Sequence, residues 1–486
     1  MANNFETLGK KYGLIAAIIT GILIWLIPTP VGMTITQHKL LAIFGGSVVV
    51  WITIGINFAV STFAVIVLLY FWVGNPTGQL NKAGMLIRNA DFAVSGFASS
   101  SLWLLVTGFV ISIAMTKSGV AKRMALHMIK IWGKTPAGAI YASMLANFII
   151  APLTPSNTAR AAAMLPIIEG IAETYKAEPG KSNFSRALFL SSAFTTNITG
   201  SAFLTGTIPN PVALGMIAAA AGASFATTWS YWALAALPTN IIILLLTGWL
   251  VLKLFPPEVK ALPGGSEYID EELKAMGPMS MREKKAIAYF ALALVLWSTD
   301  AMHNLNSTMI AFLVSLLIFL PRIGVLEWKE TEKSLPWELF VYFGGVLTLS
   351  GALMKTKAFE WIIKALVSAL GLDGMAMMPL LIILIGFSIF SHIIWSTTTA
   401  MMGVMIPIYI GLAQVMGFDI VKFVLPLAIM MAYALFLPFN TMGNIIMFGA
   451  GHYTVTEQLK SSIILGFIIW GLWIITAFTW WPIIGL

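Results

Sequence analysis

A short polar segment, residues 152–160 with the sequence PLTPSNTAR, separates two apolar runs that are each too short to cross a bilayer. The run before it, residues 137–151, would reach about 22 Å as a helix, whereas the hydrocarbon core of a membrane is about 30 Å thick. Two prolines remove backbone donors from the segment, and Ser156 stands where a helix N-cap belongs. The pattern predicts a re-entrant hairpin, residues 135–172, with a polar tip at membrane depth.

Composition supports a membrane location for this hairpin. Of the 486 residues, 58% are hydrophobic and only 10% are charged, so the chain is far more apolar than a soluble domain. We therefore predict an all-α polytopic protein of the cell membrane, with the lipid bilayer as its surroundings. The net charge of +8 comes from short loops, so membrane topology explains it better than nucleic-acid binding. Because the chain has no cysteine and only five scattered histidines, we predict no metal site and no cofactor.

The interruption recurs in the second half of the chain. An apolar run beginning at Met378 ends at a second polar segment, residues 396–399 (STTT), which predicts a second hairpin over residues 374–412. Downstream of each polar segment lies a cluster rich in Pro, Asn, Thr and Gly, residues 205–211 and residues 438–444. Matching interruptions in two halves are typical of transporters with inverted repeats, which bind substrate near the midplane. Both hairpin tips are therefore candidate binding elements.

The apolar runs predict about eleven transmembrane helices in addition to the two hairpins. Lys10 and Lys11 precede the first span and favour a cytoplasmic N-terminus, so an odd number of crossings places the C-terminus outside the cell. The basic segment 117–134 contains no acidic residue and is predicted to be an interfacial amphipathic helix that leads into the first hairpin. We divide the chain into an N-terminal span (1–38), a first inverted repeat (39–255), a cytoplasmic inter-repeat loop (256–285) and a second inverted repeat (286–486).

Hydroxyl and amide groups crowd the two predicted tips. The half-helices that follow begin with unpaired N–H groups and a positive partial charge, which suit the oxygens of a carboxylate. The alternative is ordinary Ser/Thr capping of a kinked helix, which explains one such motif more readily than two at matched places. Residues at the downstream helix breaks would complete the cavity, although Asn210, Asn440 and Asn444 would serve equally well as caps there. The predicted substrate-binding residues are Ser156, Asn157, Thr158, Ser396, Thr397, Thr398, Thr399, Thr207, Pro209, Pro438 and Thr441.

Two ionisable residues lie beside the predicted tips. Arg160 stands in an Ala/Met/Leu segment with no acid within a helical turn, and a cation there is costly unless it is paired. A bound carboxylate would supply the missing charge; the alternative is an arginine held by backbone carbonyls or by a distant acid. His392 precedes the second polar segment and is either a neutral core histidine or a protonatable group beside the site. Asp300 and His303 fall in a short loop and are expected to be solvated.

At these residues the sequence resembles the divalent anion:sodium symporter family, whose mark is a Ser-Asn-Thr motif at the tip of each of two inverted hairpins. Residues 156–158 match this motif, whereas the second copy reads Ser-Thr-Thr at residues 396–398, or is displaced by one residue toward Ala400. The string PSNTAR that ends at Arg160 and the segment 272–284 are most similar to the bacterial citrate/succinate and tartrate/succinate antiporters of this family. The resemblance covers nearly the whole chain.

The resemblance implies a homodimer that transports di- or tricarboxylates, such as succinate, malate, 2-oxoglutarate, citrate or tartrate. It also implies that each protomer consists of a scaffold domain and a transport domain that moves as an elevator. The scaffold domain would comprise about residues 1–116 and 230–354, and the transport domain about residues 135–229 and 374–486.

Sodium independence is expected from two positions. Symporters of the family bind sodium beside each motif with hydroxyl and carbonyl oxygens, and Pro152 and His392 stand where such symporters have side-chain oxygens. A lost oxygen ligand and a nearby fixed cation both weaken a hard-cation site. Arg160 and His392 would then compensate the charge of the substrate as sodium does in the symporters. Because an empty site with unpaired positive charge should cross the membrane poorly, we expect exchange rather than uniport.

Three alternatives remain from the sequence. Sodium-coupled dicarboxylate symport is the nearest of them. An intramembrane hydrolase using Ser156 or Ser396 would need a base, and only His392 is near either serine in the sequence. A channel is disfavoured because two polar tips indicate a closed site with discrete ligands.

Overall fold

The computed structural model of the chain describes residues 2–222, 228–258, 267–395 and 397–486. Within these ranges the protein consists of α-helices joined by loops, short 3-10 turns and one π-helical stretch, and it forms no β-strand. The all-α class predicted from the composition is therefore confirmed.

The helices of the first half run from the N-terminus to the long helix before the inter-repeat loop. Their bounds are α1 (Ala2–Leu26), α2 (Ile35–Thr53), α3 (Phe58–Leu68) with the π-helix η1 (Leu69–Val73), α4 (Ala90–Ala93), η2 (Ser95–Ala98), α5 (Ser100–Ser118), α6 (Val120–Trp132), α7 (Pro136–Ile150), η3 (Ala151–Leu153), α8 (Asn157–Thr174), α9 (Asn183–Ala202), η4 (Leu204–Gly206), α10 (Pro209–Ala221) and α11 (Trp229–Leu254).

The second half begins with a short helix of the inter-repeat loop and ends with the longest helix of the chain. Its elements are α12 (Glu267–Met276), α13 (Met281–Ser298), α14 (Asp300–His303), α15 (Ser307–Phe319), α16 (Trp328–Thr331), η5 (Glu332–Ser334), α17 (Trp337–Lys355), α18 (Ala358–Ala369), α19 (Met377–Phe390), η6 (Ser391–Ile393), α20 (Thr398–Met416), α21 (Ile420–Met430), η7 (Pro438–Asn440), α22 (Met442–Gly449) and α23 (Val455–Ile483).

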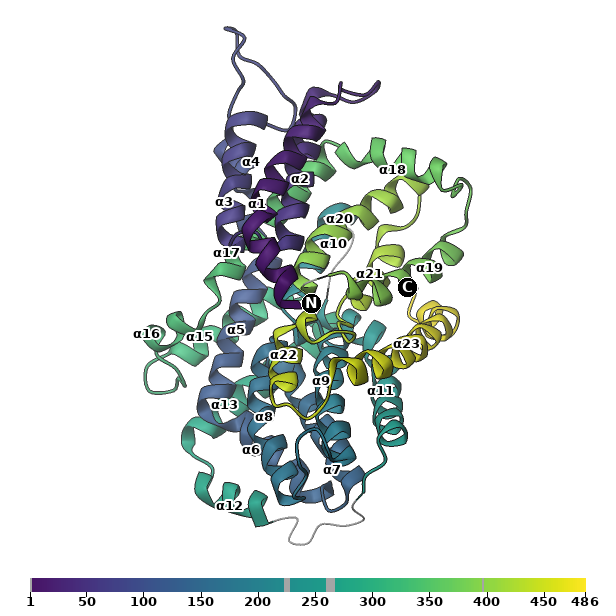
Figure 1. Cartoon of the computed structure of the whole chain (residues 1–486). Helices are drawn as coiled ribbons and strands as arrows, with labels where there is room; N and C mark the ends of the chain where they lie inside the picture. The colour runs from purple at the N-terminus through teal and green to yellow at the C-terminus, as the bar shows by residue number, and fades with distance from the viewer. Residues whose placement is uncertain (1, 223–227, 259–266, 396) are drawn as a thin grey trace.

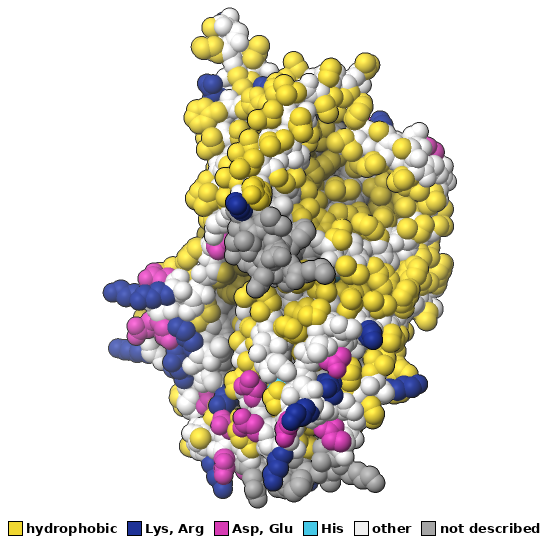
Figure 2. Space-filling view, viewed as in Figure 1, with side chains coloured by type: hydrophobic (Ala, Val, Ile, Leu, Met, Phe, Trp, Pro, Cys, Tyr) yellow, Lys and Arg dark blue, Asp and Glu magenta, His cyan; other side chains and the backbone are white. Residues whose placement is uncertain are grey.

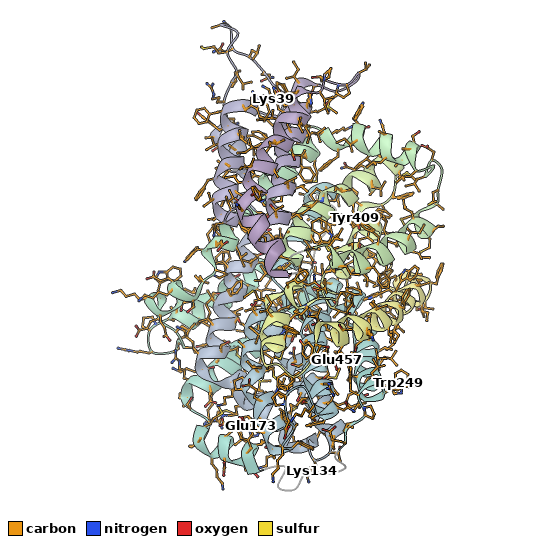
Figure 3. The ribbon with its side chains drawn as sticks, in the orientation of Figure 1. Lys39, Lys134, Glu173, Trp249, Tyr409 and Glu457 are labelled. Atoms are coloured by element: carbon orange, nitrogen blue, oxygen red, sulfur yellow. The ribbon has the colours of Figure 1, made fainter. Side chains whose placement is uncertain are left out.

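Two interrupted helix pairs approach the middle of the molecule from opposite ends. Figure 1 shows α7 and α8 in the lower half of the molecule and α19 and α20 in the upper half. Side chains confirm this placement, because Lys134 and Glu173 lie low in Figure 3, whereas Tyr409 of α20 lies high. Between the two pairs, α22 packs against both α8 and α9. Elements of the two halves therefore meet at the level of the interruptions.

By length and composition, six of the described helices can cross a membrane on their own. Several other apolar helices are shorter, including α7 and α19, the first arms of the two interrupted pairs. The second arm α20 has 19 residues and is long enough to cross, so the expectation of a short second arm is wrong there. The number of eleven crossings stays a prediction. The six long apolar helices are Ile35–Thr53, Ser100–Ser118, Trp229–Leu254, Trp337–Lys355, Thr398–Met416 and Val455–Ile483.

The surface divides into an apolar part and a charged part. In Figure 2, hydrophobic side chains cover the top and the right side, over α1, α18–α21 and α23, while charged side chains gather over the lower part and around α16 at the left. Many of the apolar side chains are large and exposed, such as Ile15, Ile22 and Leu23 on α1. A surface of this kind is stable only in contact with lipid or with another apolar surface.

The basic helix α6 is held by acidic residues of the inter-repeat segment. Lys122 Nζ lies 2.6 Å from a carboxylate oxygen of Glu272, and Lys130 Nζ lies 2.6 Å from one of Asp270, both on α12. The same short helix contacts α8, because the Tyr268 hydroxyl donates to the Pro166 carbonyl at 3.3 Å. Helix α12 thus bridges α6 and the first interrupted pair.

A buried ion pair closes this cluster. Arg123 Nε donates to Glu283 Oε1 at 2.6 Å, and its other nitrogens donate to the carbonyls of Gly277 and Met276. The side chains are only 8% and 4% exposed. Glu283 also caps the backbone N–H of Ser280 at the start of α13, so every hydrogen-bonding group of the pair is used. Removing one partner would leave the other charge buried and unpaired.

We predict that Arg123→Ala destabilises the protein by about 3–5 kcal/mol, the usual cost of stranding one member of a buried ion pair. The measurement is thermal unfolding of the purified protein in detergent, where the variant should melt at a clearly lower temperature. Lys181→Ala is the matched control, because the Lys181–Glu178 pair is 80% and 66% exposed and such pairs contribute little. Equal melting of Arg123→Ala and the control would contradict the prediction.

Candidate functional site

The tip of the first interrupted pair is capped as the sequence predicts. Thr135 caps α7 by accepting the N–H of Gly138, with Pro136 in the first turn. Ser156 caps α8, and its hydroxyl accepts the Ala159 N–H at 3.2 Å. Ser156 and Asn157 are buried, whereas Thr158 is exposed. The three residues of the first motif are thus divided between the interior and the surface.

Three asparagines join the two halves of the chain next to this tip. Asn157 Nδ2 donates to Asn197 Oδ1 at 3.2 Å, and Asn197 Nδ2 donates to Asn444 Oδ1 at 2.8 Å. The three side chains come from α8, α9 and α22. Their line places the α8 N-terminus beside the helix break of the second half.

Two glycines allow the close approach of these elements. A Cβ atom on Gly443 would lie 3.1 Å from the Asn157 carbonyl oxygen. A Cβ atom on Gly200 of α9 would lie 3.0 Å from Asn157 Oδ1 and 3.5 Å from Arg160 Nη2. The distances to Asn157 are shorter than ordinary van der Waals contacts, so a methyl group at either glycine would require Asn157 to shift by a few tenths of an ångström.

Arg160 is completely buried and is surrounded by neutral oxygens. Nη1 donates to the carbonyls of Thr154 and Gly206 at 2.5 Å each, and Nη2 donates to Asn157 Oδ1 at 2.7 Å and to the Thr196 carbonyl at 2.8 Å. Within the described residues Arg160 forms no ion pair. The structure therefore shows the carbonyl-held arginine that the sequence left open, and its positive charge is not neutralised by an acid in this part of the chain.

The second tip repeats the cap of the first. Thr397 caps α20, and its hydroxyl accepts the Ala400 N–H at 3.0 Å, just as Ser156 accepts from Ala159. A proline follows ten residues after each cap, at Pro166 and at Pro407. Residues 397–399 therefore occupy the places of residues 156–158, which is the displaced register of the second motif.

The second motif is less buried than the first. Thr398 is buried, whereas Thr397 and Thr399 are half-buried. Ser396, also predicted as a binding residue, lies outside the described residues.

His392 is buried beside the second tip with both ring nitrogens facing carbonyl oxygens. Nδ1 lies 3.0 Å from the Ser388 carbonyl, and Nε2 lies 3.1 Å from the Met431 carbonyl. A neutral imidazole has a single N–H, so only the protonated ring can donate to both carbonyls at once. The surroundings of His392 thus resemble those of Arg160, since each side chain faces several carbonyl oxygens at a helix break.

Asparagines close the helix breaks downstream of each tip. Asn210 Nδ2 donates to the Gly200 and Phe203 carbonyls at 2.8 and 3.0 Å. Asn444 Nδ2 donates to the Ala434 and Leu437 carbonyls at 2.7 and 3.3 Å. The spacing of ten and seven residues is the same in both halves, so these two asparagines are equivalent caps.

The equivalence of Asn210 and Asn444 shows which of the other predicted residues correspond between the two halves. Thr207 and Thr441 stand three residues before them and are also equivalent; Thr207 is buried and Thr441 is half-buried and caps α22. Pro209 and Pro438 are both buried, but they stand at different distances from the caps. In addition, Asn440 Nδ2 donates to the His392 and Trp395 carbonyls at 2.7 and 2.9 Å and ties this break to the second tip.

The polar face of α9 was not predicted from the sequence. Asn147 of α7 donates to Thr196 Oγ1 at 3.0 Å and accepts from Thr199 Oγ1 at 3.1 Å. With Asn197, these residues make α9 the polar centre of the site. The run of residues 191–201 (SSAFTTNITGS) between apolar segments is the signal that could have indicated it.

The N-terminus of α9 is fixed outside this polar centre by Glu258. Its carboxylate accepts the hydroxyl of Ser182 and, at 3.1 Å, the N–H of Phe184. Partial burial opposes ionisation, but these hydrogen bonds hold the pKa of the Glu258 carboxyl below its ordinary value.

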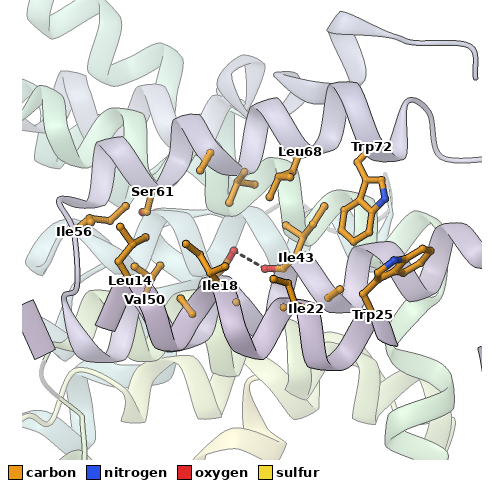
Figure 4. A pocket seen from close by; sticks show the side chains of 17 residues that line it. Leu14, Ile18, Ile22, Trp25, Ile43, Val50, Ile56, Ser61, Leu68 and Trp72 are labelled. Carbon is orange, nitrogen blue, oxygen red and sulfur yellow. Dashed lines mark hydrogen bonds between the residues drawn. The ribbon is translucent and has the colours of Figure 1, made fainter. Parts of the chain in front are cut away.

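A large cavity lies elsewhere and has a different chemistry. It measures about 450 Å³ between α1, α2 and α3, and its lining is almost wholly apolar, with Ile18, Ile22 and Ile43 near its centre in Figure 4. Trp25 and Trp72 close one end with ring centroids 4.9 Å apart. The cavity shares no residue with either tip, and its surface suits an acyl chain rather than an anion.

The expectation for Asp300 is wrong. The side chain is only 1% exposed because Asp300 begins the short helix α14 and packs against the start of α11. His303 is half-buried, with Nε2 2.9 Å from the Leu296 carbonyl. No group of three or more His, Asp or Glu residues capable of holding a metal occurs within the described part of the chain.

Comparison with known proteins places these features in one family. The family model described as the sodium:sulfate symporter transmembrane region matches residues 9–486. The chain is 28% identical over 483 residues to a membrane protein of Cupriavidus necator, covering 98% of this chain and 93% of that protein. It is 28% identical over 481 residues to the L-tartrate/succinate antiporter of Escherichia coli K12, covering 96% of each.

The fold is also found among solved transporters. Neisseria gonorrhoeae MtrF aligns with a TM-score of 0.58 at 14% identity, covering 89% of this chain and 97% of MtrF. The fold and the matches together define a multi-pass membrane transporter. The chain belongs to the divalent anion:sodium symporter family, as the resemblance predicts.

We predict that Gly200→Ala destabilises the protein by about 1–3 kcal/mol, because the added methyl group would displace Asn157 Oδ1 and the arginine that it accepts from. Thermal unfolding in detergent measures the effect. Gly471→Ala in α23 is the control, since its Cβ would meet no atom within 4 Å and alanine favours a helix. If the melting temperature of Gly200→Ala equals or exceeds that of this control, the packing around Gly200 is looser than described.

Proposed function

We propose that the protein exchanges di- or tricarboxylates, such as succinate, malate, 2-oxoglutarate, citrate or tartrate, across the cell membrane by sodium-independent elevator antiport. The observation that carries the proposal is Arg160, whose buried guanidinium is hydrogen-bonded only to neutral oxygens in the described chain. An unneutralised cation beside a helix N-terminus attracts an anion. Relatives named as L-tartrate/succinate antiporters support carboxylates as that anion.

Sodium independence is supported by the side chains that face the buried carbonyl oxygens near each tip. Hard cations such as sodium bind oxygen ligands of the type that Thr154, Gly206, Asn157 and Thr196 present. Here the guanidinium of Arg160 takes all four oxygens. The carbonyls of Ser388 and Met431 likewise face a side chain, the ring of His392. A sodium ion would have to displace a cationic or hydrogen-bonding side chain that the chain itself supplies.

The substrate would lie between the two capped tips. In this proposal its carboxylates accept hydrogen bonds from the N-terminal N–H groups of α8 and α20 and from the hydroxyls of the two motifs. The asparagine line from Asn157 to Asn444 supports a shared pocket, because it joins the first tip to the helix break of the second half. The substrate-binding residues proposed from the described chain are Ser156, Asn157, Thr158, Thr397, Thr398, Thr399, Thr207, Pro209, Pro438 and Thr441, with Arg160 and His392 compensating charge.

The proposed moving part comprises α7–α11 and α19–α23 and is called the hairpin unit below. The sequence alone assigned residues 230–354 to the scaffold. Helix α11 packs mainly against α9 and α23, so we assign it to the hairpin unit together with them. The scaffold would then contain α1–α5 and α13–α17. At the boundary between the hairpin unit and the scaffold, Gly215 of α10 lies close to Ser101 of α5. A Cβ atom on Gly215 would lie 2.6 Å from the Ser101 hydroxyl oxygen. Contacts between small residues leave few protrusions to oppose sliding.

The remaining parts of the proposal concern assembly and orientation. Exposed apolar side chains on α3 and α15, such as Phe63 and Leu316, support a homodimer formed through the scaffold. The N-terminus is proposed to be cytoplasmic and the C-terminus extracellular. Hydrolase activity is disfavoured, because the hydroxyl of Ser156 serves as a helix cap and both nitrogens of His392 face carbonyls.

Proteoliposomes loaded with unlabelled succinate should take up labelled succinate at the same initial rate with sodium or with choline outside. The physical reason is that side chains of the protein already face the carbonyl oxygens around Arg160 and His392, so no external cation is needed there. Vesicles without internal carboxylate are the control and should take up little, because an empty site with unpaired positive charge crosses poorly. Strict dependence on sodium would assign the protein to sodium-coupled dicarboxylate symport instead.

Arg160→Ala should reduce succinate exchange by about tenfold or more, the effect of losing about 1.4 kcal/mol or more of charge compensation. Rates are compared at equal amounts of folded, monodisperse protein. Arg186→Ala is the matched control, because Arg186 pairs with Glu457 outside both tips. Exchange that continues at the wild-type rate in Arg160→Ala would remove Arg160 from the site.

A further inference from the structure

The start of α11 is fixed to the segment α13–α15 by a buried carboxylate. Ser230 Oγ donates to Asp300 Oδ1 at 2.5 Å, and the Ser230 N–H donates to Asp300 Oδ2 at 3.2 Å. Asp300 is 1% exposed and forms no ion pair within the described chain. Its charge is therefore stabilised mainly by two donors at a helix N-terminus, where the dipole favours an anion.

Trp229 adds a flat contact to the same segment. Its ring stacks on Trp297 of α13 with centroids 5.8 Å apart and an interplanar angle of 12°. Its backbone N–H donates to Ser307 Oγ at 3.2 Å, and the Trp297 indole in turn donates to the Ser307 carbonyl at 3.1 Å. The two rings are nearly parallel and offset from each other.

The other side of Trp229 leads to the first tip. The indole Nε1 donates to Thr205 Oγ1 at 3.1 Å, and the Thr205 hydroxyl donates to the Pro152 carbonyl at 3.2 Å. The neighbouring carbonyl of Gly206 accepts from Arg160. Phe203 also stacks on Trp229, with centroids 5.8 Å apart. A single tryptophan thus connects the proposed scaffold to the polar segment that begins the first binding motif.

The contacts of α11 are of two kinds. Along its length the helix packs against α9 and α23, for example through Thr239, whose hydroxyl lies 2.6 Å from that of Thr476. Its hydrogen bonds to α13–α15 include those from Trp229 and Ser230 in its first turn. A movement of the hairpin unit would therefore leave the packing of α11 against α9 and α23 intact and would separate the contacts of Trp229 and Ser230 with α13–α15.

We propose that the junction of Trp229 and Ser230 with Trp297, Asp300 and Ser307 is a latch that forms in the conformation seen here and opens in every transport cycle. The proposal rests on the proposed function, since it requires that the hairpin unit move against the scaffold. Opening would return Asp300 to water, which offsets the loss of its two hydrogen bonds. Through Thr205, the state of the latch is transmitted to the tip that holds Arg160.

The experiment uses the absence of cysteine from the chain. In the double variant Ser230→Cys/Asp300→Cys, a disulfide or a short bis-maleimide link joins the two sides of the latch. The linked protein in proteoliposomes is expected to lose succinate exchange by about tenfold or more, and reduction of the disulfide is expected to restore it. Linked protein that exchanges at the rate of the reduced protein would overturn the proposal.

A matched pair tests whether linkage alone stops exchange. Thr239→Cys/Thr476→Cys links α11 to α23 within the hairpin unit, and its linked form is expected to remain active. If the unmodified chain does not exchange carboxylates at all, the proposed function fails; if it exchanges but ignores the Ser230–Asp300 link, only the latch fails.

A second measurement does not depend on the double variant being active. Ser307 is 4% exposed and differs from cysteine by a single atom, so a thiol in Ser307→Cys should keep the stacked tryptophans and react with a membrane-impermeant maleimide only when the latch opens. Labelling is expected to be faster with succinate on both sides of the membrane than without it. Equal labelling with and without exchange would contradict an opening in each cycle.

Discussion

The structure depends on satisfying backbone groups where helices break inside an apolar protein. Each of the four breaks leaves backbone carbonyls without a helical partner, and a buried polar group that stays unpaired in apolar surroundings costs several kcal/mol. Side chains with N–H donors close these breaks, namely Arg160 and Asn210 in the first half and His392, Asn440 and Asn444 in the second. The same donors fix the two capped tips, so the groups that permit the fold also shape the site.

The two halves close their helix breaks with side chains of different charge. The place of Arg160 in the first half, four residues after the helix cap, is taken in the second half by Met401, which is fully buried. His392 has no ionisable counterpart in the first half, where Pro152 stands in the corresponding 3-10 turn. The backbone arrangement is therefore repeated, whereas the electrostatics are not, and the first tip carries the permanent positive charge.

Local chemistry was predictable from the sequence, and long-range pairing was not. The short apolar arms, the caps at Thr135 and Ser156 and the second interruption all follow from spacing and capping preferences over a few residues. The register of the second motif was ambiguous because any of four consecutive Ser and Thr residues can cap a helix. Only the bond from Ala400 to Thr397 decides between them.

The environment of single polar residues depended on partners that are distant in the chain. Asn197 gains its role from Asn157 and Asn444, at separations of 40 and 247 residues. Asp300 was expected in water because the loop around it is short and polar, but its donors lie 70 residues earlier in α11. No local pattern indicates such pairings, and so the partners of the polar run on α9 and those of the buried carboxylate could be found only from the fold.

The ion pair between α6 and the start of α13 has a consequence for biosynthesis. Arg123 and Glu283 are separated by 160 residues and lie on opposite sides of the boundary between the halves. While a ribosome is completing the first half, Arg123 lacks the carboxylate with which it pairs in the folded protein. The buried ion pair and the packing of α6 against α12 and α13 can therefore form only after the linker and the first turn of α13 have emerged.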